Sequence, residues 1–139
     1  MSSTDQLTGG CQCGAARYAV AGEPLAIYVC HCRECQKQSA SAFGISVSVR
    51  PADFRPGQGR VSAWSRRTDS GRTLSCRFCP ACGSRLWHQS DDPDMPLSVK
   101  GGSLDRPVDL RGAIHIWTAR KLAGVVIPPD ARQFPGEPG

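Results

Sequence analysis

Short runs in which apolar and polar residues alternate recur along the chain, and this pattern predicts strands rather than long helices. The clearest run is residues 43–49, where Ile45, Val47 and Val49 alternate with serines, as expected of a half-buried strand. The polar segment at residues 36–42 predicts one or two helical turns. Further strands are expected over residues 15–21, 25–29, 60–66, 72–78, 85–88, 97–102 and 112–118.

A turn at Gly22-Glu23-Pro24 separates the first two predicted strands. A hairpin of residues 15–21 with residues 25–29 would bring the cysteine-containing segments at their ends close together. The chain of 139 residues has the length of one domain, and its 15 glycines and 11 prolines favour short strands and turns. We therefore predict a single, mainly β domain over residues 1–139.

The chain has no run near the ~18 apolar residues that a membrane-spanning helix needs. Its first residues, MSSTDQLTGG, lack the basic and apolar regions of a signal peptide. We therefore expect a cytoplasmic protein without a membrane partner. In that reducing compartment, the eight cysteines are expected to bind metal or react rather than form disulfides.

All eight cysteines lie in three short segments, GGCQCG, CHCREC and CRFCPACG. Tetrahedral metal sites collect cysteines in pairs one or two residues apart, whereas disulfide frameworks usually spread them along the chain. Zinc is the ion that this donor set favours, although an iron–sulfur cluster also accepts four cysteines. We predict two zinc ions per chain.

The spacing divides seven of the cysteines into two unequal sites. A CxC pair and a CxxC pair complete one tetrahedral site, with the ligands Cys11, Cys13, Cys79 and Cys82. The CxCxxC triplet supplies a second site, with the ligands Cys30, Cys32 and Cys35. Four sulfurs close a structural site, whereas a three-sulfur site keeps a position for water or substrate, as catalytic zinc does.

Cys76, in the predicted strand RTLSCRF, leaves two alternatives open. It is either a buried small residue near the metal, or the fourth ligand of the triplet, in which case no position would stay open. As the one unassigned cysteine, it would also be the nucleophile if the protein were instead a redox enzyme.

The formal net charge of +5 is weaker evidence for a nucleic-acid partner once metal binding is counted. Zinc with four thiolates carries −2 and zinc with three carries −1, so the metal-loaded chain stands near +2 after three charges are subtracted from +5. We interpret the cations beside the clusters as local charge compensation, namely Arg33, Lys37, Arg77 and Arg85. We expect no nucleic-acid partner, and a salt-dependent affinity would reveal one.

The cysteine motifs resemble those of the glutathione-dependent formaldehyde-activating enzyme family, which also includes the zinc-binding domain of centromere protein V. The similarity runs from GGCQCG through VCHCRECQKQSASAFG and FCPACGSRLWH to HIWT and IPPDARQFPGEP, with a core at about residues 7–135. It implies a small zinc-containing fold of several coiled β-sheets, similar to that of methionine sulfoxide reductase B. It also implies that the four-cysteine set matches the family's structural zinc ligands and the triplet its catalytic zinc ligands.

The resemblance implies a carbon–sulfur lyase reaction that forms or cleaves S-(hydroxymethyl)glutathione, with a glutathione-like thiol and an aldehyde as small-molecule partners. The residues support this chemistry because zinc with three thiolates can hold a substrate thiol as thiolate or polarise a carbonyl oxygen. The alternative is a non-catalytic zinc protein that binds glutathione or a macromolecular partner and shows no turnover.

Three histidines are further candidates for the site. His31 lies between two cysteines of the triplet, and in an extended segment its ring points away from their sulfurs, so packing is expected rather than ligation. His88 and His115 could each move a proton near the open site, although a structural role is the simpler expectation.

Overall fold

The computed structural model describes residues 6–138 and shows a mainly β protein, as the hydropathy pattern predicts. Ten strands of this part of the chain form a three-stranded sheet and a seven-stranded sheet. The strands are β1 (Leu7–Gly10), β2 (Arg17–Val20), β3 (Ala26–Cys30), β4 (Gly44–Val49), β5 (Phe54–Pro56), β6 (Ser62–Arg67), β7 (Thr73–Phe78), β8 (Arg85–Ser90), β9 (Leu97–Lys100) and β10 (Ile114–Ile116).

Helical structure in the described residues is short. The α-helix is α1 (Arg33–Ser39), and the 3-10 helices are η2 (Pro51–Asp53), η3 (Gly101–Ser103) and η4 (Thr118–Arg120). Helix α1 confirms the predicted helical turns and ends at Ala40, which takes a left-handed conformation. Between residues 6 and 138, no helix combines the length and the apolar character needed to cross a membrane.

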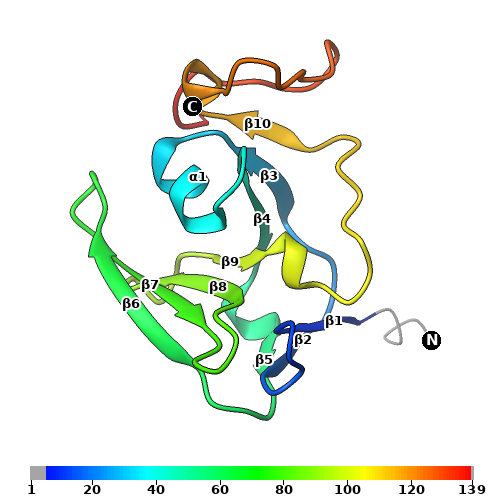
Figure 1. Ribbon diagram of the computed structural model, residues 1–139, viewed down its shortest axis with the longest axis vertical. Coiled ribbons are helices and arrows are strands. Elements are labelled where there is room, and N and C mark those ends of the chain that lie inside the picture. The colour runs from blue at the N-terminus through cyan, green and yellow to red at the C-terminus, as the bar shows by residue number, and fades with distance from the viewer. Residues whose placement is uncertain (1–5, 139) are drawn as a thin grey trace.

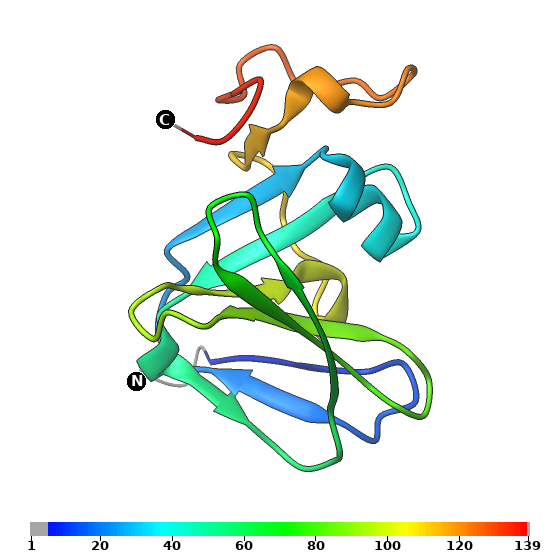
Figure 2. The same ribbon diagram turned by 90° about the vertical axis from the view of Figure 1, so that its left-hand side faces the viewer.

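The seven-stranded sheet has the order β10-β3-β4-β9-β8-β7-β6, and the three-stranded sheet has the order β1-β2-β5. Strand β10 runs parallel to β3, and the other pairs are antiparallel. Strands β10 and β6 therefore form opposite edges of the large sheet (Figure 1). The view in Figure 2 shows the three-stranded sheet below the middle of the large one.

The hydrophobic core lies between the two sheets. Tyr18 and Phe54 from the small sheet pack on Trp87 of the large sheet, with ring centroids 6.3 and 4.7 Å from that of Trp87. Val47 and Val49, predicted to form the buried side of residues 43–49, are both buried in this core. Aromatic rings and branched aliphatic side chains thus hold the sheets together, and each contributes by removing apolar surface from water.

The predicted hairpin of residues 15–21 with residues 25–29 is wrong. Strand β2 pairs with β1 and β5, whereas β3 pairs with β4 and β10. The tight connection forms one step earlier, between β1 and β2, where the Cys11 N–H donates to the Ala16 carbonyl at 3.1 Å. Strand β2 pairs in the small sheet because its buried Tyr18 and Val20 belong to the core between the sheets.

The hydropathy pattern also did not indicate strands β1 and β5. Strand β1, LTGG, contains only one large apolar residue, and β5, FRP, covers three residues beside a predicted turn. Both are ordered by long-range pairing with β2, because a strand this short gains its stability from its partners and not from its own propensity.

Candidate metal centres

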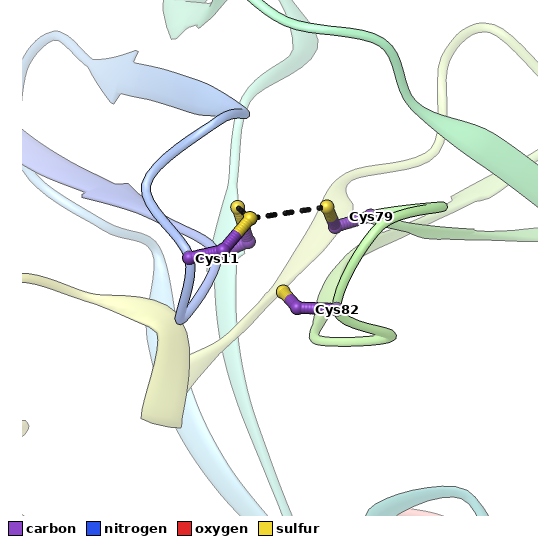
Figure 3. Close-up of side chains that lie close together, drawn as sticks. Cys11, Cys79 and Cys82 are labelled. Atoms are coloured by element: carbon purple, nitrogen blue, oxygen red, sulfur yellow. Dashed lines mark hydrogen bonds between the residues drawn. The ribbon is translucent and has the colours of Figure 1, made fainter.

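The first cysteine group joins two connections that are distant in the sequence. Cys11 and Cys13 lie between β1 and β2, and Cys79 and Cys82 lie between β7 and β8. All four sulfurs are within 4.8 Å of one another. Cys13 and Cys79, 66 residues apart, have sulfurs 3.8 Å apart, and the Cys11 and Cys13 sulfurs are 3.5 Å apart. Figure 3 shows Cys11 facing Cys79 and Cys82 across the space between the two connections.

The two connections are built in the same way. A glycine follows the last cysteine of each, and both Gly14 and Gly83 have a positive φ, +83° and +81°, which lets the chain turn back sharply. The Gly14 N–H donates to the Cys11 carbonyl at 3.1 Å, and the Gly83 N–H donates to the Cys79 carbonyl at 2.8 Å. Each turn therefore presents its two cysteines to the same side.

The four sulfurs fit a tetrahedral zinc ion. With Zn–S bonds of about 2.3 Å, the sulfurs of such a site lie roughly 3.8 Å apart, close to the measured separations. Backbone and hydroxyl donors favour thiolates at Cys11 and Cys82, whereas at Cys13 the Ala15 backbone donor is outweighed by the Cys11 and Cys82 thiols, which raise the pKa to about 11. The Ala16 N–H donates to the Cys11 sulfur at 3.2 Å and lowers the pKa of that thiol. The Ser84 hydroxyl beside Cys82 lowers the pKa of Cys82 to about 5.

The second cysteine group is formed by local structure alone. Cys30 ends β3, Cys32 is the N-cap of α1, and Cys35 lies in the first turn of that helix. Their sulfurs also lie within 4.8 Å of one another. The Cys35 N–H donates to the Cys32 sulfur at 3.3 Å, and the hydrogen bond from the Cys30 thiol lowers the pKa of Cys32 to about 2. The pKa values of Cys30 and Cys35 are raised, so the contacts among the three sulfurs favour one thiolate, at Cys32. The group is a three-sulfur donor set of the kind that zinc binds.

Cys76 belongs to neither group. It lies in β7 opposite Trp64 and His88, and none of its surface is exposed. This position supports the interpretation of Cys76 as a buried small residue rather than as a fourth ligand of the triplet. A thiol without solvent access is also a poor nucleophile, so the position does not favour a redox enzyme that uses Cys76.

One cleft borders both cysteine groups. Its volume is about 1070 Å³, and Cys35 lies on its wall together with Cys11 and Cys82. Residues of the segments 37–45 and 100–105 also line it. This volume is at the upper end of the ~300–1,000 Å³ that small-molecule sites typically occupy, so the cleft can admit a peptide-sized thiol.

The cleft is lined by more positive than negative side chains. Lys37, Arg85 and Lys100 face it, whereas its acidic residue, Asp105, forms an ion pair with Arg17 at 2.5 Å. Of the four cations predicted to compensate the clusters, Lys37 and Arg85 line the cleft, while Arg33 and Arg77 do not. The hydropathy pattern did not indicate Lys100, because its place in the cleft depends on strands that are distant in the sequence.

Two of the candidate histidines pair with each other. His31 Nε2 lies 3.0 Å from His115 Nδ1, and both rings are buried and stacked. His31 therefore packs against β10 and is not part of either sulfur group, as the extended segment predicts. Burial lowers the pKa of both rings, which favours the neutral forms.

His88 is buried on β8. Burial, together with the charges of Lys100, Arg85 and Arg66, lowers its pKa from 6.5 to about 3. The folded protein therefore keeps His88 neutral at pH values where the unfolded chain binds a proton. The free energy of unfolding must then fall as the pH falls from 6.5 towards 3, because the unfolded state gains protons that the folded state does not.

We expect His88→Gln to remove this pH dependence. Between pH 7.5 and pH 5.0 the wild type should lose about 2 kcal/mol more stability than the variant, given a histidine pKa near 6.5 in the unfolded chain. Urea unfolding of both proteins at the two pH values measures the difference. The cysteines and the other two histidines are common to both, so their titration cancels. If the two proteins lost the same amount of stability, the lowered pKa of His88 would be contradicted.

Comparisons with known proteins agree with the geometry of the two groups. The crystal structure of a Rhodobacter sphaeroides protein superposes with a TM-score of 0.59 at 24% sequence identity, over 78% of this chain and 97% of that one, and so shows a shared fold. The sequence model described as "Glutathione-dependent formaldehyde-activating enzyme" matches residues 6–120, which include both cysteine groups. The chain belongs to the family of the glutathione-dependent formaldehyde-activating enzyme.

Proposed function

We propose that this protein is a zinc-dependent carbon–sulfur lyase that forms or cleaves the adduct of a small thiol with an aldehyde, such as S-(hydroxymethyl)glutathione. The observation that carries the proposal is the inequality of the two cysteine groups. One group has four sulfurs and the other has three, and the three-sulfur group borders the cleft through Cys35. A set of three protein ligands beside a cleft is typical of catalytic zinc.

The two groups would have different roles. Cys11, Cys13, Cys79 and Cys82 would hold a structural zinc ion, which joins the β1–β2 and β7–β8 connections. Cys30, Cys32 and Cys35 would hold the second ion. When bound there, zinc would supply a Lewis acid with a free position for the sulfur or the oxygen of the substrate.

The reaction is an addition, in which the S–H bond and the carbonyl π bond are replaced by a carbon–sulfur bond and an O–H bond. The thiol sulfur attacks the aldehyde carbon, a carbon–sulfur bond forms, and the carbonyl oxygen receives the proton that the thiol gives up. The reverse sequence cleaves the adduct. The protein's part is to hold the thiol and the aldehyde together at the Cys35 end of the cleft, since fixing two reactants in one site removes much of the entropic barrier to their encounter.

The lining of the cleft supports an anionic thiol as the substrate. Lys37 and Arg85 contribute positive charge, and Asp105 is already paired with Arg17. Glutathione carries two carboxylates and one ammonium group, so its net charge is complementary to this lining. The volume of about 1070 Å³ accommodates a tripeptide.

The direct test is the exchange rate between formaldehyde plus glutathione and their adduct. We expect the zinc-loaded protein to accelerate this exchange above the spontaneous rate, and magnetisation-transfer NMR measures both rates in one sample. S-methylglutathione, which has no free thiol, is the matched control and should not exchange. If the protein bound glutathione but the exchange stayed at its spontaneous rate, the result would contradict the lyase and support a non-catalytic carrier.

A further inference from the structure

Lys100 is a buried cation without a carboxylate partner among residues 6–138. It is the last residue of β9, opposite Ser46 on β4, and only 9% of its surface is exposed. Its ammonium donates a hydrogen bond to the Ser46 hydroxyl at 3.3 Å and forms no ion pair with a described acidic side chain. Burying an ammonium group in this way is unfavourable unless negative charge lies nearby.

The acidic residues near the cleft are committed elsewhere. Asp105 is held by Arg17, and Glu34 on α1 lies 3.8 Å from Arg66. His88, whose pKa is influenced by the charge of Lys100, is neutral. Among the described residues, the Cys35 sulfur lies near Lys100 across Gly44, and it becomes negatively charged when it binds a metal ion as thiolate.

Gly44 brings Lys100 and Cys35 together. A Cβ atom built on Gly44 would lie 3.5 Å from the Cys35 sulfur and 3.6 Å from the Lys100 Nζ. The sulfur and the ammonium therefore lie within about 7 Å of each other, the sum of these two distances, with no Gly44 side chain between them. At this separation in a partly buried site, a unit positive charge stabilises a thiolate appreciably.

We propose that Lys100 is the counter-charge of the three-cysteine centre. Three thiolates with one divalent zinc ion carry a net charge of −1, and a substrate thiolate in the free position would make the net charge −2. The ammonium of Lys100 offsets that charge from the wall of the cleft. Lys100 would thus be a positioning residue that acts on the centre through Cys35. The inference rests on the proposed function only in taking this group as a zinc site.

The test is the zinc affinity of the two centres in Lys100→Met, measured without substrate. Titration with a competing chelator resolves the two zinc equivalents in one experiment. We expect one equivalent to bind about tenfold more weakly than in the wild type, and the other to be unchanged, because only the three-cysteine centre loses a nearby charge. Methionine has nearly the same length as lysine, so the packing between β4 and β9 is kept.

Two further variants separate charge from packing. Lys100→Arg restores the positive charge and should recover most of the zinc affinity. Arg55→Met removes the same charge from an exposed residue of β5 outside the cleft, whose guanidinium donates to the Ala52 carbonyl, and should leave both zinc equivalents unchanged. The metal-free Lys100→Met protein should be at least as stable as the metal-free wild type, because a buried charge has been removed.

Several outcomes would overturn the inference. Unchanged zinc affinity in Lys100→Met would do so, and if glutathione binding were then weaker, Lys100 would instead contact a carboxylate of the thiol. A wild-type protein that binds only one zinc ion would overturn it as well. A different result separates the inference from the proposed function. If the wild type bound two zinc ions and Lys100→Met weakened one of them, but the protein did not accelerate the exchange of formaldehyde with glutathione, the proposed function would be contradicted and this inference supported.

Discussion

Cys35→Ser is expected to remove most of the turnover of the thiol–aldehyde adduct while the fold is kept. Cys35 is the member of the triplet that borders the cleft, and serine is a weak zinc ligand because its hydroxyl stays protonated at neutral pH. Loss of a direct ligand should lower kcat/KM by at least about 100-fold, since even residues that only orient metal ligands typically cost 10 to 100-fold. The exchange rate and the zinc content of the variant measure the two effects together.

Cys76→Ala is the matched control for this experiment. It removes another sulfur, but one that lies in β7 and belongs to neither cysteine group. We expect normal turnover and two zinc ions, with a loss of about 1 kcal/mol in stability from the small cavity in the interior. If Cys35→Ser kept full turnover and the same zinc content, the triplet would have no part in the reaction.

Cys82→Ser is expected to destabilise the whole domain. The four-cysteine group joins two connections whose cysteines are 66 residues apart, so its ion would restrain a long segment of the unfolded chain and hold the two connections in place. A loss of about 3 kcal/mol or more is expected, which lowers the thermal midpoint by about 10 °C or more in a domain of this size. Differential scanning calorimetry with and without a chelator provides the measurement.

Cys82 suits this test because its side chain is exposed, as is that of Cys13, whereas Cys79 is part of the hydrophobic core. Replacing Cys82 therefore removes a ligand with little change in packing. Ala81→Ser, at the neighbouring exposed position, is the matched surface change and should leave the midpoint unchanged. If Cys82→Ser melted at the wild-type temperature, or if chelator had no effect on the wild type, the four-cysteine group would have no structural role.

The cysteine pairs and the triplet could be anticipated because each depends on short-range geometry, and the joining of the two pairs was inferred from the four ligands that a closed zinc site needs. A CxC or CxxC segment closed by a glycine can turn in few ways, and each of them presents both sulfurs to one side, as Gly14 and Gly83 show. The triplet is also local, since it lies within the end of β3 and the first turn of α1. Strand β4 was likewise predicted correctly, because one buried face produces a regular alternation of valine and serine.

The pairing of the strands could not be anticipated in the same way. The turn at Gly22 suits a hairpin, yet β2 and β3 enter different sheets, because β2 must place Tyr18 and Val20 in the core between them. Turn residues favour a reversal of the chain, but only the burial of side chains from distant segments decides which strand becomes the neighbour. Strands β1 and β5 are similarly defined by their partner and carry little hydrophobic pattern of their own.

The amino-acid sequence by itself determined the mainly β class, the two cysteine pairs and the triplet, since these follow from local periodicity and spacing, and it left open whether Cys76 completes the triplet. The tertiary structure decided that both groups border one cleft, that Cys76 is enclosed away from them, and that Lys100 approaches Cys35 across the space left by Gly44. The last of these features arises where α1, β4 and β9 meet. Charges and cavities there depend on contacts between distant segments, for which a linear pattern contains no signal.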